Sequence, residues 1–175
     1  VGHWLVQCVQ MGTRIISIDP RLTWWGARAE YWLRPHPGTD ACIALAWLNV
    51  ITQEDLIDRE FVECWCAYYD ELKEHVAQFT PEWAASITTV PAEDIAASAR
   101  LYANAERGAI QWGLVFAAGT SSAMHWTEAV CDLMAICGNI EKPGTHVLVH
   151  NSFDINAGYS SVDLYADPKA LERKF

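Results

Sequence analysis

The sequence lacks the cysteine spacing that metal centres use. Its six cysteines include no C-x-x-C pair of the kind found in zinc and iron–sulfur sites. Cys64 and Cys66 stand two residues apart in an expected helix, so they point to different faces. We therefore expect all six to be buried, unpaired thiols that behave as small apolar residues. Cys137, next to Gly138, is the one whose contacts with a ligand are worth checking.

The sequence also lacks the marks of nucleic-acid-binding and membrane proteins. A net charge of −10 leaves no basic excess for sequence-independent nucleic-acid binding. No apolar run is long enough to span a bilayer, and the N-terminus has no signal peptide. An initiator Met is missing too, and the first residues resemble the middle of a helix. We expect an excised piece of a longer protein, whose compartment stays open.

What the chain does have is ample material for a core. With 175 residues and 51% hydrophobic content, we expect one domain over residues 1–150, and residues 151–175 as a passage toward a further domain. Its nine Trp side chains are large rings that fill cores, line cavities or become exposed where a neighbouring domain is absent.

The strongest local signal is the stretch MGTRIISIDPR, residues 11–21. A helix over residues 1–11 ends at Gly12, and a β-branched run then stops at Asp19 and Pro20. Because Pro20 cannot donate to a sheet ladder, the strand must end there. Ligands of doubly wound α/β domains lie outside the carboxyl ends of the strands, where an acid commonly takes a ribose hydroxyl. We therefore expect Asp19 to face a nucleotide.

A second signal is RPHPGTD, which follows an extended piece at residues 31–33. The two prolines hold the chain extended, Gly38 permits a turn, and Thr39 or Asp40 can cap the next helix. A turn with an N-cap explains Gly-Thr-Asp completely. The alternative is that Asp40, at the end of the next strand of the same sheet, accepts hydrogen bonds from the ring N–H and the exocyclic amine of a guanine.

The rest of the chain predicts an α/β fold. The pattern predicts a Rossmann-like three-layer domain with a mostly parallel sheet, which lacks its first strand because the strand and glycine-rich turn that should precede the first helix are absent. Further helices are expected at residues 41–52, in short pieces between 53 and 86 with caps at Asp58 and Thr80, at 91–105 and after Gly119, and further strands at 109–116 and 147–149.

Two of these expected elements carry candidate ligand contacts. Trp112 and Gly113 lie in the predicted strand at 109–116, toward the end where a parallel sheet presents its ligand surface. Residues 120–122, Thr-Ser-Ser, stand at a helix N-terminus, where backbone N–H groups and hydroxyls can bind phosphate. A simple helix cap explains these hydroxyls equally well.

The motifs together resemble a known family. IDPRLTWWGARAEYWL…PGTD, VPAEDIAASARLYANAE, IQWG and GNIEKPG, in that order over residues 12–144, are similar to the molybdopterin oxidoreductases of the dimethyl sulfoxide reductase family. The resemblance implies a catalytic subunit with molybdenum or tungsten held by bis-molybdopterin guanine dinucleotide. It also implies a 4Fe–4S cluster outside this chain. The residues of the first motif are similar to those of the anaerobic dehydrogenase and acetylene hydratase branches of the family.

The resemblance carries over residue by residue. It implies that Asp19 meets the ribose and Arg21 the phosphate or base, while Gly38 and Asp40 meet the guanine. It gives this chain no catalytic or metal-ligating residue, since the cluster cysteines and the metal-ligating segment belong upstream. The isolated chain should therefore be inactive. The implied partners are the guanine dinucleotide, the remaining domains of the parent chain and an iron–sulfur electron-transfer subunit.

The chain departs from the family pattern at three places. Trp112 and Gly113 should lie near the cofactor, but Leu-Val-Phe-Ala-Ala-Gly follows them where relatives have a polar loop. His36 stands where an arginine is common, which leaves one phosphate contact open. Glu141 stands in the glycine-bounded loop where Gly or Asp is usual.

Two other functions are compatible with the sequence. One is a structural subunit without molybdenum, like the large subunit of respiratory complex I. The other is an NAD-dependent dehydrogenase domain in which Asp19 binds the adenosine ribose.

Overall fold

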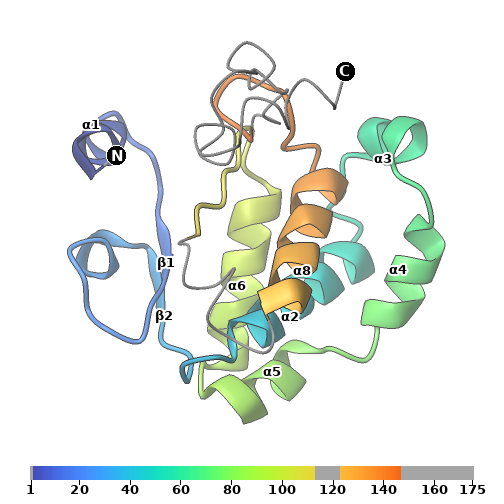
Figure 1. Ribbon diagram of the computed structural model, residues 1–175, viewed down its shortest axis with the longest axis horizontal. Helices are drawn as coiled ribbons and strands as arrows, with labels where there is room; N and C mark the ends of the chain where they lie inside the picture. The colour runs from blue at the N-terminus through green and yellow to red at the C-terminus, as the bar shows by residue number, and fades with distance from the viewer. Residues whose placement is uncertain (1, 113–122, 147–175) are drawn as a thin grey trace, which may run out of the picture.

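The computed structural model describes residues 2–112 and 123–146. It is a mixed helix and sheet structure, with a small sheet beside a larger helical body (Figure 1). The elements, in chain order, are α1 (Gly2–Gln10), β1 (Ile16–Ile18), the 3-10 turn η1 (Gly26–Arg28), β2 (Tyr31–Leu33), α2 (Asp40–Gln53), α3 (Arg59–Trp65), α4 (Tyr69–Val76), α5 (Pro81–Thr88), α6 (Ala92–Ala103) and α8 (Ala123–Ile136).

The predicted parallel pairing is confirmed by β1 and β2. Ile16 pairs with Tyr31 and Ile18 with Leu33, so the carboxyl ends of both strands reach the same edge of the sheet. The predicted strand at 109–116 is wrong where it can be checked. Residues 109–112 are irregular: the Ile110 N–H donates to the His146 side chain, and the Gly108 N–H just before them donates to the Asn139 side chain, so neither N–H enters a strand ladder. Residues 113–116 and the predicted strand at 147–149 lie outside the described residues.

Helix α2 is the centre of the helical body. It packs against α4, α5, α6 and α8 (Figure 1). Because neighbours surround it, most of its residues are buried, and its sequence is apolar on nearly every side and not on one face alone. Ile43 and Ile51 have no exposed surface, and Leu133 of α8 is equally buried. The predicted apolar face of α8 is confirmed, with all of its members buried: Trp126, Ala129, Val130, Leu133, Met134 and Ile136.

Side-chain caps begin two of the short helices, as their sequences predict. The Phe61 N–H donates to Asp58 Oδ1 at 3.0 Å at the start of α3. The Trp83 N–H donates to Thr80 Oγ1 at 3.2 Å before α5, where proline occupies the first turn. Thr39 precedes α2 but does not cap it, since its hydroxyl donates to the His36 carbonyl at 2.7 Å.

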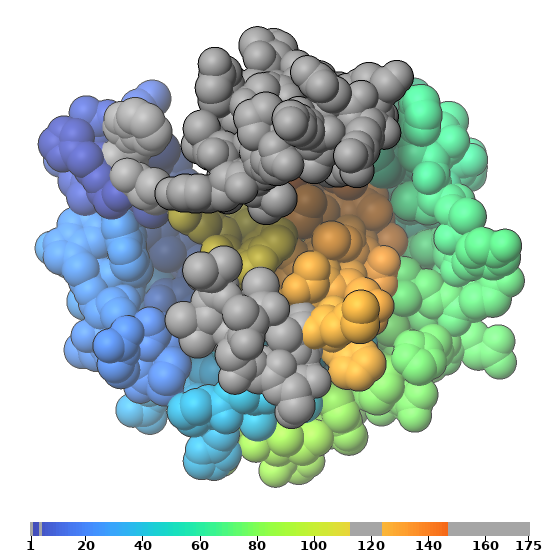
Figure 2. Space-filling model, in the orientation of Figure 1, coloured from blue at the N-terminus to red at the C-terminus, as the bar shows by residue number. Residues whose placement is uncertain are grey.

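The expected burial of the cysteines is wrong, although all six are free thiols as predicted. Cys8, Cys64 and Cys131 are exposed on the outer sides of their helices, whereas Cys42, Cys66 and Cys137 are half-buried and pack against the edge of the core. Figure 2 shows the outer side of α8 reaching the surface beside the residues of α3–α5. Burial, and to a lesser degree the nearby Asp58 carboxylate, raise the pKa of the Cys137 thiol to about 12. Cys137 is therefore a neutral thiol at neutral pH.

None of the helices in the described ranges combines the length and the apolar character that a membrane span requires.

Candidate functional site

Asp19 follows β1 directly and is fixed by its own backbone. Its N–H donates to the Leu33 carbonyl at 3.1 Å, which extends the ladder by one residue. Its carboxylate oxygen Oδ1 accepts from the Arg21 N–H at 2.8 Å, and the Arg21 guanidinium lies 3.7 Å from the same oxygen. The Arg21 side chain is 84% exposed against 27% for Asp19. The strand end therefore presents an anchored carboxylate with a movable cation beside it.

Asp40 is the first residue of α2, and its carboxyl group is buried at the helix N-terminus. Only 5% of the residue is exposed. Burial raises the pKa of this carboxyl above its usual range, while the N–H groups of Asp40 and Gly38 favour the charged form. Gly38 adopts φ +87°, a backbone conformation that favours glycine, and in this conformation its N–H reaches the Asp40 carboxylate.

The fold brings Asp19 and Asp40 into electrostatic contact. The Asp19 carboxylate raises the pKa of Asp40 further, after the effects of burial and of the backbone N–H groups. Two like charges influence each other this way only when they share one region of the molecule. The acid after β1 and the PGTD acid therefore belong to one candidate site. The expected place of Asp40 at the end of a strand is wrong, because β2 ends at Leu33 and Asp40 begins α2.

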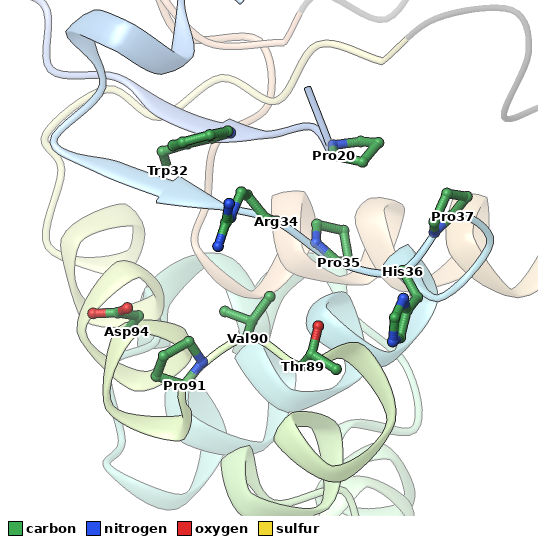
Figure 3. Close-up of a pocket in the computed structure, with 10 residues that line it drawn as sticks. All are labelled: Pro20, Trp32, Arg34, Pro35, His36, Pro37, Thr89, Val90, Pro91 and Asp94. Carbon is green, nitrogen blue, oxygen red and sulfur yellow. The ribbon is translucent and has the colours of Figure 1, made fainter. Parts of the chain in front are cut away.

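A cavity of about 410 Å³ opens at the same edge of the sheet (Figure 3). It lies between the segment that follows β2 and the connection from α5 to α6, and Pro20 from the end of β1 closes one side. Its walls consist of Pro20, Trp32, Arg34, Pro35, His36, Pro37, Thr89, Val90, Pro91 and Asp94. None of the predicted residues Asp19, Arg21, Gly38 and Asp40 lines it. Asp19 and Arg21 flank Pro20, and Gly38 follows Pro37, and both prolines do line it.

Trp32 connects the two strand ends behind this cavity. Its indole N–H donates to the Asp19 carbonyl at 2.9 Å. The Arg34 guanidinium lies 5.1 Å from the centre of the same indole ring, within the range of a cation–π contact. Arg34 and the exposed His36 give the cavity two basic side chains opposite Asp94.

Sequence reasoning missed Arg34, Trp32 and Asp94. Arg34 directly follows β2, so its place at a strand end was a usable signal. Asp94 lies in the first turn of α6, where an acid usually indicates helix stabilisation only.

The other predicted contacts lie apart from this cavity. Trp112 is half-buried, and its ring centre lies 6.4 Å from that of His146. Gly113 and residues 120–122 lie outside the described residues. Among residues 2–112 and 123–146, no three His, Cys, Asp or Glu side chains gather in a way that could hold a metal ion.

Comparisons with known proteins agree on one family. The family model described as molybdopterin oxidoreductase matches residues 3–167. The alpha subunit of the F420-dependent formate dehydrogenase of Methanocaldococcus jannaschii is 38% identical over 150 residues, which cover 84% of this chain and 22% of that protein. Acetylene hydratase of Syntrophotalea acetylenica is 36% identical over 135 residues, covering 77% and 18%.

A solved structure extends the likeness to three dimensions. The acetylene hydratase from Pelobacter acetylenicus superposes with a TM-score of 0.78 at 33% identity, covering 82% of this chain and 20% of that one. The chain thus spans about a fifth of the length of the relatives it matches.

Proposed function

Because the chain belongs to the molybdopterin oxidoreductase family, we propose that it is the part of the parent enzyme that holds the guanosine end of one molybdopterin guanine dinucleotide. The observation that carries this proposal is that Asp19, after β1, and Asp40, at the N-terminus of α2, lie near enough for their charges to interact, beside a cavity whose walls include Arg34 and His36. This is the edge of an α/β sheet at which nucleotides bind.

The surroundings of Asp40 fit a guanine. A carboxylate has about four acceptor positions, and the N–H groups of Asp40 and Gly38 use only some of them. Guanine offers two adjacent donors, its ring N–H and its exocyclic amine, which a charged carboxylate can accept together. Such donors would offset the burial that now penalises the charge of Asp40.

The neighbouring residues fit the rest of a nucleotide. Asp19 Oδ1 is engaged by Arg21, which leaves the second carboxylate oxygen to accept from ribose hydroxyls. The exposed Arg21 can reach a phosphate, and Arg34 offers a second cation at the cavity. His36 replaces the arginine expected there, so Arg34 is the residue best placed to supply the missing charge. Trp112 and Gly113 complete the proposed cofactor contacts.

The role of this chain in the reaction would be to orient the cofactor. When bound, the bis-molybdopterin guanine dinucleotide centre of the parent supplies two-electron chemistry at molybdenum or tungsten. This chain would anchor the nucleotide end and contribute no group to the chemical step. We propose that the isolated segment is inactive, since its relatives are several times longer. Some relatives are named as subunits, which supports partner subunits for the parent. We propose that one of these is an iron–sulfur electron-transfer subunit and that a 4Fe–4S cluster lies elsewhere in the parent.

The test uses the full-length parent protein with Asp40→Asn. An asparagine keeps the size but replaces one acceptor with an amine that opposes the guanine donors. Charge-assisted hydrogen bonds contribute about 1.5–3 kcal/mol, so the variant should retain about 10-fold less guanosine monophosphate, measured after acid hydrolysis of the purified protein. Asp132→Asn is the matched control, because Asp132 is a half-buried carboxyl whose pKa is also raised by burial.

Three results would overturn the proposal. Equal retention by Asp40→Asn and Asp132→Asn would separate Asp40 from the guanine. A parent protein with neither molybdenum nor tungsten would favour a structural subunit. Tight binding of NADH by the parent would favour a dehydrogenase domain, with Asp19 on the adenosine ribose.

A further inference from the structure

A histidine side chain joins two segments that are far apart in the sequence. The Ile110 N–H donates to His146 Nε2 at 2.8 Å. The backbone of His146 is itself fixed, since its N–H donates to the Asn139 carbonyl at 3.2 Å and its carbonyl accepts from the Glu141 N–H at 2.8 Å. The loop after α8 therefore holds the imidazole rigidly against the irregular segment at residues 109–112.

This geometry requires a neutral imidazole. A ring nitrogen accepts a hydrogen bond only when it carries no proton, so the proton of His146 sits on Nδ1. His146 is half-buried, and burial lowers the pKa of its imidazole below the ordinary value. Among the described residues, the charged groups on the adjoining segments are Glu106, Arg107, Glu141 and Lys142. Arg107 is paired with Glu106 at 3.3 Å, and Lys142 with Asp58 at 2.9 Å.

The same imidazole faces Trp112. The two ring centres lie 6.4 Å apart with planes inclined at 41°, and Ile110 and Trp112 both pack on the core. One side chain thus fixes both the backbone of this segment and the indole at its end. Within the described ranges, residues 109–112 pair with no strand that could do so.

We propose that His146 is a positioning residue of the cofactor site, which holds residues 110–112 so that Trp112 meets the guanine dinucleotide. The inference rests on the proposed function for the role of Trp112, but the hydrogen bond itself does not. Protonation turns Nε2 into a donor that faces the Ile110 N–H, so the segment is held at neutral pH and released in acid.

The first measurement is hydrogen exchange of the Ile110 amide in the full-length parent protein, corrected for intrinsic rates, from about pH 8 to about pH 4.5, which brackets the ordinary histidine pKa of about 6.5. Wild-type protection should fall about 10-fold toward acid, as expected when a buried donor loses its partner. His146→Phe keeps a ring without the acceptor, so protection should be low at every pH. His146→Gln restores an acceptor that does not titrate, so protection should be high and flat.

The second measurement is guanosine monophosphate retained by the same proteins. Retention should follow protection, falling in His146→Phe and becoming independent of pH in His146→Gln. His125→Gln is the control, because His125 is 75% exposed and should leave both readouts unchanged.

The two readouts separate the possible failures. Protection that does not respond to pH or to His146→Phe would overturn the inference outright. Protection that responds while retention stays constant would overturn the positioning role and leave the guanine contacts of Asp40 intact. A wild-type protein that responds but contains no guanosine would overturn the proposed function, and the positioning role with it.

Discussion

Gly138→Ala should destabilise the fold strongly, because Gly138 is buried just after α8. Gly138 follows α8 and adopts φ +61°, in the left-handed region. An added Cβ would lie 2.8 Å from Asp58 Cγ and 2.9 Å from Asp58 Cβ, and closer still to one carboxylate oxygen. Real Cβ atoms do not approach so closely, so Asp58 must move.

The magnitude follows from what Asp58 does. Its carboxylate caps α3 through the Phe61 N–H at 3.0 Å and binds Lys142 Nζ at 2.9 Å. The left-handed conformation costs about 1–2 kcal/mol for alanine, loss of the cap about 1 kcal/mol, and loss of the partly exposed ion pair at most about 1 kcal/mol. Gly138→Ala should therefore lower the free energy of unfolding by about 2–4 kcal/mol.

Urea unfolding of the chain measures this, with Gly12→Ala as the matched control. Gly12 has φ +97° but no atom within 4 Å of an added Cβ, so only the backbone term of about 1–2 kcal/mol applies. In an Asp58→Gly background the contact atoms are gone, and the effect of Gly138→Ala should shrink to that backbone term. Equal losses for Gly138→Ala and Gly12→Ala, or an undiminished loss in the Asp58→Gly background, would refute the reasoning.

Three further predictions concern the helical body. Ile51→Ala should lower the free energy of unfolding by about 2–5 kcal/mol in a urea titration, because Ile51 is fully buried in α2; a loss below about 1 kcal/mol would contradict this packing. Thr80→Ala should cost about 1 kcal/mol by the same assay and Thr39→Ala clearly less, since only Thr80 caps its helix; equal losses would argue against the cap. Lys142 and the Phe61 N–H lower the pKa of Asp58, so its stabilisation is complete above the unfolded value of about 3.9 and is lost as pH falls through the folded value. When urea midpoints are measured against pH, Asp58→Asn should reduce the loss of stability at acid pH. An unchanged pH dependence would contradict the stabilising role of the Asp58 carboxylate.

The sequence predicted the local structure well because local chemistry decides it. Pro20 ends β1, Asp58 and Thr80 cap their helices, and the apolar face of α8 is buried as its spacing indicates. The same reasoning failed for the cysteines and for residues 109–112. A thiol suits a core or a surface equally, and a short apolar run becomes a strand only where a partner strand is available.

The sequence by itself determined that Asp19 follows a strand and that Asp40 stands at a turn before a helix, and so placed both among the candidates. Only the tertiary structure decided that their charges interact, that Asp94 of α6 joins Arg34 around one cavity, and that His146 accepts from Ile110. Caps and strand ends depend on neighbours along the chain, whereas burial, pKa values and cavities depend on groups that only packing brings together.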